Sequence, residues 1–291
     1  MPQKTLRAAA IHDISGIGKC SLTVALPILS VMGVETAVLP TAILSAHTGF
    51  SGFTYRDLTE DMPGIAAHWK KEGAAFDALY SGFLGSVGQI QIVSDIFDAF
   101  KTNENLLLVD PVMGDGGKLY QTYTEPMAQG VVELCKKADI IVPNMTEAAY
   151  IVGEPYESGP YRQEDIEKLL KKLSRIGPKQ VVLTGVWFRE EAVGSACYCR
   201  ETGEIHYCFY KKYPGYFHGT GDIFGSVLLG GILNGLPVAE AQALAAEFVG
   251  LCIQSSMGRE RNPQMGVCFE RCLPWLLQKL QKRLEKADGI G

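Results

Sequence analysis

Cysteines at metal-ligand spacing are missing from this chain. It has eight cysteines but no Cys-x-x-Cys pair, and none of its five histidines pairs with a cysteine at ligand spacing. A structural zinc site is therefore not expected. We interpret the cysteines as small buried hydrophobic residues of a protein in the reducing cytosol. They are Cys20, Cys135, Cys197, Cys199, Cys208, Cys252, Cys268 and Cys272, and Cys197 and Cys199 alternate in an expected strand.

Long apolar runs and an excess of basic charge are also missing. The longest apolar stretch, residues 223–233, is broken by glycines and a serine and falls short of the roughly 20 residues that span a bilayer. Residues 7–12 are too short for the apolar region of a secretory signal. The net charge of −5 offers no basic field for nucleic acid or an anionic membrane. We therefore expect a cytoplasmic protein without membrane or nucleic-acid partners.

Apolar segments alternate with amphipathic ones along the chain. The 291 residues, 47% hydrophobic and 20% charged, suit one large α/β domain over residues 1–291, and no internal repeat interrupts it. Strands are expected at 6–12, 34–40, 76–81, 106–110, 138–143 and 180–185, and helices at 20–32, 87–100, 126–137, 164–176, 222–233, 238–254 and 273–286. Continuous apolar strands separated by helices predict a three-layer α/β/α fold with a mostly parallel central sheet. Segments 195–200 and 205–213 alternate and predict a small antiparallel hairpin at one edge.

Polar residues follow several of these strands. His12-Asp13 lie at the end of the first strand, Asp110 ends the fourth, Asn144 follows the fifth, and Thr184-Gly185 end the sixth. Ligands of such sheets bind at the carboxyl ends of the strands, so these residues are expected to converge on one edge.

The segment Gly219-Thr220-Gly221-Asp222 opens directly into an apolar helix. The first amides of a helix lack partners and attract phosphate, and glycine lets a ligand approach the backbone closely. Asp222 could simply complement the helix dipole, or it could act as a base beside bound phosphate. The residues alone leave both interpretations open.

Two further segments carry carboxylates at strand ends. Asp110 and Asp115 lie in a glycine-rich loop, which suits either a solvated turn or phosphates bridged by magnesium. Asn144 and Glu147 have the spacing of a helix capping box, but they also sit where a metal shell would be completed.

Two segments offer groups to an organic ligand. The glycine-rich segment 15–20 fails the Walker A pattern because Cys20 stands where Ser or Thr is required, and it fails the dinucleotide fingerprint because Ser21 replaces the third glycine. It remains a glycine-rich loop near a substrate. His47 and Thr48 offer stacking or hydrogen bonds to a polar aromatic ligand.

These motifs together resemble the ribokinase-like (PfkB-type) superfamily, and within it the pyridoxal (vitamin B6) kinases. The similarity runs from about His12 to Gly235. Its motifs are Gly219-Thr220-Gly221-Asp222, the anion-hole and base motif; Asp110-Pro111-Val112-Met113-Gly114-Asp115; Asn144-Met145-Thr146-Glu147, the magnesium motif; His47-Thr48-Gly49-Phe50; and Thr184-Gly185.

The resemblance implies ATP-dependent phosphorylation of the 5′-hydroxymethyl group of pyridoxal, pyridoxine or pyridoxamine by a homodimer. Asp222 would be the base, and the amides of residues 219–222 would form the anion hole. The other implied roles are magnesium binding by Asp110, Asp115 and Glu147, a K⁺ or Na⁺ ion near Asp110 and Val142, nucleotide binding by Asn144, Thr184, Gly185, Thr220 and Gly221, and substrate binding by His12, Asp13, Ser15, His47, Thr48, Phe83 and Asp222.

The chain also departs from the pattern of these kinases. Relatives commonly have serine near the end of the first strand, where this chain has His12-Asp13, and their Gly-Tyr appears here as Gly82-Phe83. The alternatives are a hydroxymethylpyrimidine kinase of the same superfamily and a non-catalytic nucleotide-binding regulator. Asp222 argues against the regulator, because a sensor needs the anion hole but no base.

Overall fold

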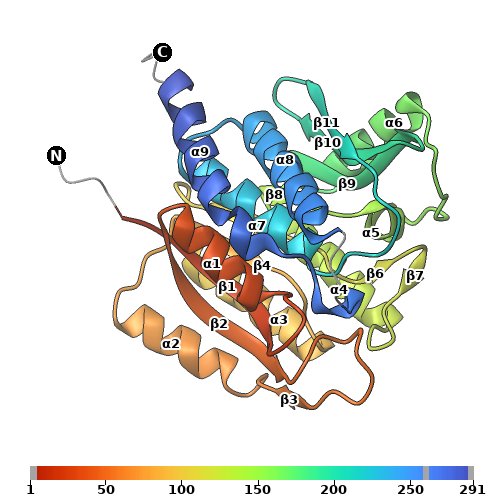
Figure 1. Cartoon of the computed structure of the whole chain (residues 1–291). Helices are drawn as coiled ribbons and strands as arrows, with labels where there is room; N and C mark the ends of the chain where they lie inside the picture. Colours follow the sequence, from red (N-terminus) through yellow and green to blue (C-terminus); the bar gives the residue numbers. More distant parts are fainter. Residues whose placement is uncertain (1–4, 258–261, 288–291) are drawn as a thin grey trace.

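A nine-stranded sheet forms the middle of three layers in the computed structural model, which describes residues 5–257 and 262–287 (Figure 1). Its strands are β1 (Leu6–Ser15), β2 (Val34–Leu44), β3 (Tyr55–Asp57), β4 (Ala78–Ser81), β5 (Leu106–Val109), β8 (Ile140–Ile141), β9 (Gln180–Arg189), β10 (Ala192–Cys199) and β11 (Ile205–Lys211). They lie in the order β11-β10-β9-β8-β5-β4-β1-β2-β3.

The six central strands of this sheet are parallel, as the sequence predicts. Strands β9, β8, β5, β4, β1 and β2 pair in parallel, whereas β10 and β11 form the predicted antiparallel hairpin at one edge. Strand β3 adds an antiparallel strand at the other edge. A separate two-stranded ladder joins β6 (Gly114–Asp115) to β7 (Lys118–Leu119). The predicted fold class is confirmed.

Helices cover both faces of the sheet. The sheet separates the hydrophobic core into two halves, one on each face. The helices are α1 (Leu22–Val31), α2 (Met62–Lys71), α3 (Val87–Phe100), α4 (Glu125–Lys137), α5 (Met145–Val152), α6 (Gln163–Arg175), α7 (Thr220–Leu233), α8 (Val238–Ser256) and α9 (Leu273–Ala287). Helices α1, α7, α8 and α9 pack on one face, and α2 to α6 pack on the other (Figure 1). Burial on both faces explains why the parallel strands are continuously apolar.

Several elements differ from the sequence-based prediction. Strand β1 runs three residues further, to Ser15, and β9 runs to Arg189. The sequence analysis missed β3, whose three residues are all exposed and so carry no apolar pattern. It also missed α2, which has Pro63 and Gly64 in its first turn. The β6–β7 ladder was missed because two residues per strand are too few to show alternation.

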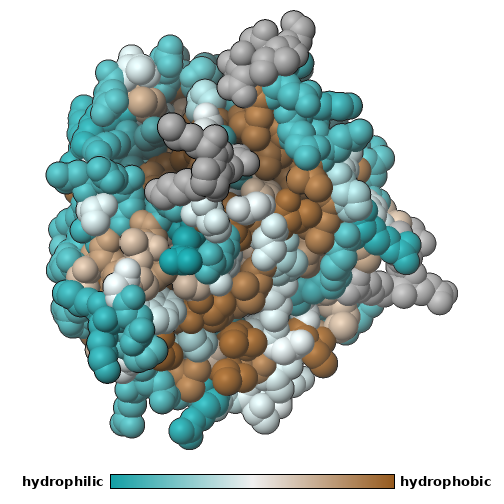
Figure 2. Space-filling model, turned by 90° about the vertical axis from the view of Figure 1, so that its left-hand side faces the viewer, coloured by the Kyte–Doolittle hydropathy of each residue, from teal (hydrophilic) through white to brown (hydrophobic). Residues whose placement is uncertain are grey.

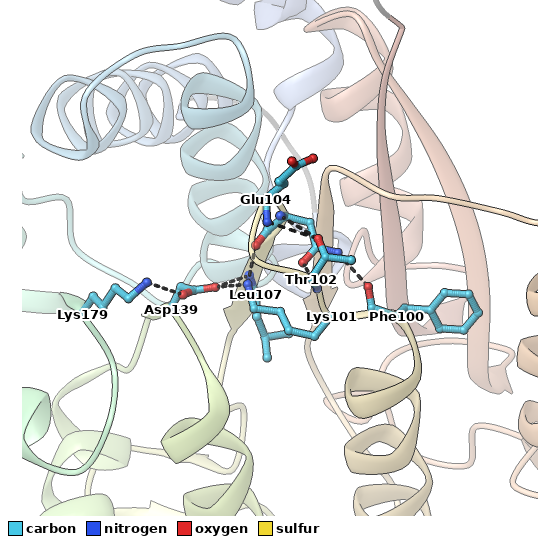
Figure 3. A network of polar contacts seen from close by, with 8 residues as sticks. Phe100, Lys101, Thr102, Glu104, Leu107, Asp139 and Lys179 are labelled. Atoms are coloured by element: carbon cyan, nitrogen blue, oxygen red, sulfur yellow. Dashed lines mark hydrogen bonds and ion pairs between the residues drawn. The ribbon is translucent and has the colours of Figure 1, made fainter.

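Ion pairs connect the strands at the amino end of the sheet (Figure 3). Asp139 precedes β8, and its carboxylate lies 2.7 Å from Lys101 Nζ and 3.3 Å from Lys179 Nζ. The amide of Leu107 in β5 donates to the same carboxylate at 3.0 Å. One carboxylate thus links α3, β5 and the start of β9, at the end of the sheet opposite to the ends of the parallel strands that carry the predicted site.

The surface is hydrophilic over much of the side shown in Figure 2, with a band of hydrophobic side chains across it. Large apolar side chains that are exposed include Ile17, Ile43 and Tyr55. Within residues 5–257 and 262–287, none of the helices is both long enough and apolar enough to cross a membrane.

Candidate active site

A cavity of about 500 Å³ opens at the carboxyl ends of the parallel strands. It collects residues from every strand end that the sequence analysis singled out. Those of the predicted site that line it are Asp13, Ser15, His47, Thr48, Phe83, Asp110, Asp115, Asn144, Glu147, Thr184, Gly185, Gly219, Thr220, Gly221 and Asp222. Val142 lines it as well. Residues spread over more than 200 positions in sequence therefore meet in one place.

The charge of the cavity wall is of one sign. Its lining carries five carboxylates, those of Asp13, Asp110, Asp115, Glu147 and Asp222, and among the described lining residues there is no lysine or arginine. A polyphosphate would be repelled by such a wall unless a cation came with it. Among the described lining residues, the attraction for an anion therefore comes from backbone dipoles.

The start of α7 supplies those dipoles. Gly219 caps the helix with φ 78°, and no side chain caps it. The first amide paired within the helix is that of Ile223, which donates to Gly219 O at 3.0 Å. The amides of Thr220, Gly221 and Asp222 are therefore available to an anion. A Cβ at Gly219 would lie 2.0 Å from Lys19 O, so glycine is needed here for space as well as for its dihedral angle.

Asp222 lies in the first turn of α7 and is half-buried on the cavity wall. Burial raises the pKa of its carboxyl to about 7, with a further rise from the charge of Asp13. A hydrogen bond from the Ser21 backbone opposes this rise. A carboxylate with a pKa near neutrality is suited to accept a proton during a reaction.

Asp110 and Glu147 form a second group of buried carboxylates. Burial raises the pKa of both groups, that of Glu147 to about 8, and the charges of Glu147 and Asp222 raise the pKa of Asp110 further. Glu147 accepts the amides of Met113 at 3.1 Å and Asn144 at 2.8 Å. The capping box of α5 predicted from Asn144 and Glu147 is thereby confirmed. Asp110 has the carboxyl groups of Glu147 and Asp222 as neighbours, and a bound cation would reduce the repulsion among these groups.

The three carboxylates predicted to bind magnesium lie at different depths. Asp110 and Glu147 are buried, whereas Asp115 is exposed on the β6–β7 ladder. Within the described residues, no three His, Cys, Asp or Glu side chains are grouped closely enough to hold a metal unaided. The arrangement fits magnesium that keeps several waters and takes its other ligands from phosphates.

The wall near β8 and β9 is largely backbone and small side chains. The Asn144 side chain accepts the amides of Thr146 and Glu147 and donates to Gly114 O at 2.9 Å, so it is mostly occupied within the protein. Gly185 has φ 74°, and the nearest atom to an added Cβ, Met145 Cγ, would lie 4.0 Å away. A flat ligand could therefore approach the end of β9 closely.

His47 and Thr48 form the wall near β2. The Gly49 amide donates to His47 Nδ1 at 3.1 Å, and His47 Nε2 lies 2.7 Å from Gln264 O. These contacts place the proton on Nε2 and occupy both nitrogens, so His47 offers a ligand its ring rather than a hydrogen bond. The ring lies 4.3 Å from that of His218. Phe83 faces the same cavity from the end of β4.

His12 does not reach the cavity, contrary to its predicted place among the substrate-binding residues. The ring is fully buried and lies edge-on to Tyr80 at 4.3 Å, and burial lowers its pKa to about 3. The pairing of β1 with β2 shifts register between His12 and Ile14. Such an irregularity re-aims side chains. It leaves His12 in the core and Asp13 on the cavity wall.

Several lining residues were missed by the sequence analysis. Ser21 lies between Asp13 and Asp222, and Tyr216 hydrogen-bonds the Asp115 carboxylate from the segment that precedes α7. Tyr120 and Cys20 also line the cavity. Ser21 directly precedes α1, and Tyr216 lies three residues before Gly219, so both lie next to segments that the sequence analysis considered. The sequence could not show which side chains they contact, because those contacts depend on the tertiary structure.

Residues 36–265 match the phosphomethylpyrimidine kinase family. Pyridoxal kinase of Arabidopsis thaliana is 28% identical over 245 residues, which cover 79% of this chain and 75% of the plant protein.

Solved structures resemble the whole fold. A Bacteroides thetaiotaomicron protein crystallised with pyridoxal is 38% identical, with a TM-score of 0.90 over 96% of each chain. Pyridoxal kinase from Lactobacillus plantarum is 32% identical, with a TM-score of 0.86 over 97% of this chain and 99% of its own. The family match covers most of the chain and includes every cavity-forming strand end except that of β1, which precedes residue 36. The chain therefore belongs to the phosphomethylpyrimidine kinase family, with the ribokinase-like fold of the pyridoxal kinases.

Proposed function

We propose that this kinase transfers the γ-phosphoryl group of ATP to the 5′-hydroxymethyl group of pyridoxal, pyridoxine or pyridoxamine. One observation carries the proposal: Asp222, whose pKa is raised to about 7 by burial, faces the cavity beside the unpaired amides of α7. A base and an anion site side by side are what transfer to a hydroxyl requires. The names of the relatives supply the acceptor.

In this proposal Asp222 accepts the proton of the hydroxyl as its oxygen attacks phosphorus. The amides of Gly219, Thr220, Gly221 and Asp222 stabilise the charge on the phosphoryl oxygens. These donors are fixed by the helix before the substrate arrives, so no reorganisation is needed as charge develops.

Asp110, Asp115 and Glu147 are proposed to hold Mg²⁺, partly through water. Bound Mg²⁺ would neutralise phosphate charge that the acidic wall otherwise repels. The five carboxylates and the absence of lysine and arginine among the described lining residues support this assignment. We place the monovalent cation beside Asp110 and Val142, which line the same part of the cavity.

The two substrates are proposed to occupy opposite ends of the cavity. ATP would lie along Asn144, Thr184, Gly185 and the start of α7, and the pyridine ring would lie among Ser15, His47, Thr48 and Phe83. These residues line one continuous space. A homodimer in the cytoplasm and a single kinase domain over residues 1–291 remain predictions, the first of which sedimentation analysis would test.

The decisive assay measures ADP release with pyridoxal, pyridoxine, pyridoxamine and hydroxymethylpyrimidine side by side, each with and without Mg²⁺. We expect Mg²⁺-dependent turnover of at least one B6 vitamer. If no acceptor is turned over while ATP still binds, the protein is a nucleotide-binding regulator instead.

Hydroxymethylpyrimidine is the second candidate acceptor because the matched family is named for phosphomethylpyrimidine. Both acceptors carry a hydroxymethyl group on a nitrogen heterocycle, so the phosphoryl chemistry would be the same. A kcat/KM for hydroxymethylpyrimidine above that for every B6 vitamer would select this second function.

A further inference from the structure

Ser21 has a backbone conformation that serine rarely adopts. Its dihedral angles are φ 55° and ψ −129°, and Lys19, two residues earlier, has φ 59°. Such conformations persist only where the surroundings hold them, and they gather at functional sites. The segment lies against the anion site, because Lys19 O occupies the space where a Cβ of Gly219 would be.

The Ser21 hydroxyl does not perform its usual task for a residue in this position. Ser21 is the N-cap residue of α1, and serine at an N-cap normally accepts a backbone amide of its own helix. Here it makes no such bond. Its Oγ donates instead to Asp13 Oδ1 at 2.5 Å, while the Ser21 backbone hydrogen-bonds the Asp222 carboxylate.

Asp13 is held in turn so that it can receive this bond. Its exposed fraction is 4%, and Ser15 Oγ donates to the other carboxylate oxygen at 2.9 Å. Both carboxylate oxygens of Asp13 thus accept a hydrogen bond from a serine hydroxyl. An isolated bridge between Ile14 and Ser21 brings the two ends of the loop together. The chain of contacts runs from Asp13 through Ser21 to Asp222.

We propose that Asp13 is a positioning residue for Asp222: by binding the Ser21 hydroxyl it holds Ser21 in its strained conformation, and the Ser21 amide then fixes the Asp222 carboxylate. This proposal rests on the role of Asp222 as base in the proposed function. It changes the sequence-based interpretation of Asp13 as a residue that binds the substrate ring.

The same loop is held from its other side. Lys19 Nζ donates to Val267 O at 3.1 Å and to Glu270 at 2.6 Å. A Cβ at Gly266 would lie 2.6 Å from Gly18 O, so the segment after residue 262 lies directly on the loop. With one end fixed by Lys19 and the other by Asp13, Ser21 cannot relax to an ordinary conformation without one of these contacts breaking.

The test is a double-mutant cycle on kcat with the best acceptor. We expect Asp13→Ala and Ser21→Ala each to lower kcat about 10- to 100-fold, and the double variant to be no worse than either single one, because both remove the same link. KM for the acceptor should change less than threefold. Asp13→Asn keeps an acceptor for Ser21 Oγ and should retain kcat within about threefold. Ser30→Ala, at an exposed serine of α1, is the matched control and should leave kcat unchanged.

Three results would overturn the positioning role. Additive losses in the double variant would mean that the two residues act separately. A raised acceptor KM with normal kcat in Asp13→Ala alone would return Asp13 to substrate binding. A loss in Asp13→Asn equal to that in Asp13→Ala would show that charge, not anchoring, matters.

A crystal structure of the Ser21→Ala variant tests the positioning role of Asp13 even if the acceptor is not a B6 vitamer. We expect residue 21 to leave the positive-φ region and the Asp222 carboxylate to move. If both stay in place, the proposal is wrong whatever the substrate. An inactive wild-type protein would overturn the proposed function alone.

Discussion

Asp222 lies half-buried in the first turn of α7, and the loss of solvation there raises the pKa of its carboxyl to about 7. We predict that Asp222→Ala lowers kcat at least about 10³-fold, which is within the range for loss of a positioned base. ATP should still bind, because the α7 amides remain. ADP-release kinetics and ATP titration by calorimetry measure the two effects. Near-normal turnover would reject Asp222 as the base.

The pKa of Asp222 also sets a pH dependence. The base must be ionised, so we expect kcat/KM for the acceptor to rise about tenfold per pH unit below a pKa of about 7 and to level off above it. The pH profile at saturating MgATP tests this. The residual activity of Asp222→Asn should lack this limb; the same limb in that variant would assign it to another group.

Asp110 illustrates the cost of placing negative charges together in the core. Burial and neighbouring charges raise its pKa above the ordinary value, so the folded protein holds a proton that the unfolded chain releases above about pH 4. Folding stability from this group therefore falls as pH rises. We predict that Asp110→Asn raises the Tm of the ligand-free protein by at least about 2 °C at pH 7.5, with no difference near pH 4.

The same substitution should weaken magnesium binding, and so should Asp110→Ala. We expect the Mg²⁺ concentration for half-maximal activity to rise about tenfold or more in both variants. Thermal melts without metal and magnesium titrations with it separate the two effects. An unchanged magnesium titration would remove Asp110 from the metal site, whatever the Tm shows.

At the scale of elements, the anion site is a single helix start whose geometry depends on one glycine. Gly219→Ala must move Lys19 O or the start of α7, because the new Cβ would lie 2.0 Å from that oxygen. We predict a kcat loss of about 10²- to 10³-fold, the effect typical of one displaced anion-hole donor. Gly203→Ala is the matched control: Gly203 has a similar φ of 73° but no atom within 4 Å of the added Cβ. It should cost stability but no activity.

The parallel strands could be predicted from the sequence because each is a buried apolar run with polar residues at its end. The same reasoning located 15 of the predicted site residues at one cavity. It failed at His12, because the irregularity of β1 beside Asp13 leaves no mark on the apolar pattern. It gave no role to Ser21, because only tertiary contacts bring the Ser21 hydroxyl to Asp13.

At the scale of the whole molecule, the two ends of the sheet use carboxylates in opposite ways. At the carboxyl end, buried acids face one another, and their pKa values rise. At the amino end, Asp139 lies between two lysines and accepts a backbone amide. The first arrangement destabilises the ligand-free fold and suits a cation-dependent site. The second holds strands and helices together where no ligand is proposed to bind.

The contribution of Asp139 to folding stability therefore changes with pH in the opposite direction to that of Asp110. Burial raises its pKa, but hydrogen bonds from Lys101 and the Leu107 amide and the charge of Lys101 outweigh this, so its pKa is lowered. Its stabilisation is complete above the unfolded pKa of about 4 and is lost as pH falls below it. We predict that Asp139→Asn lowers unfolding free energy by about 1 kcal/mol at pH 7 and has little effect at pH 3. Asp165→Asn, at an exposed ion pair with Arg162, is the matched control and should leave the unfolding free energy nearly unchanged. Urea unfolding at both pH values measures the differences, and an equal loss at pH 3 would show that the Asp139 charge does not stabilise the amino end of the sheet.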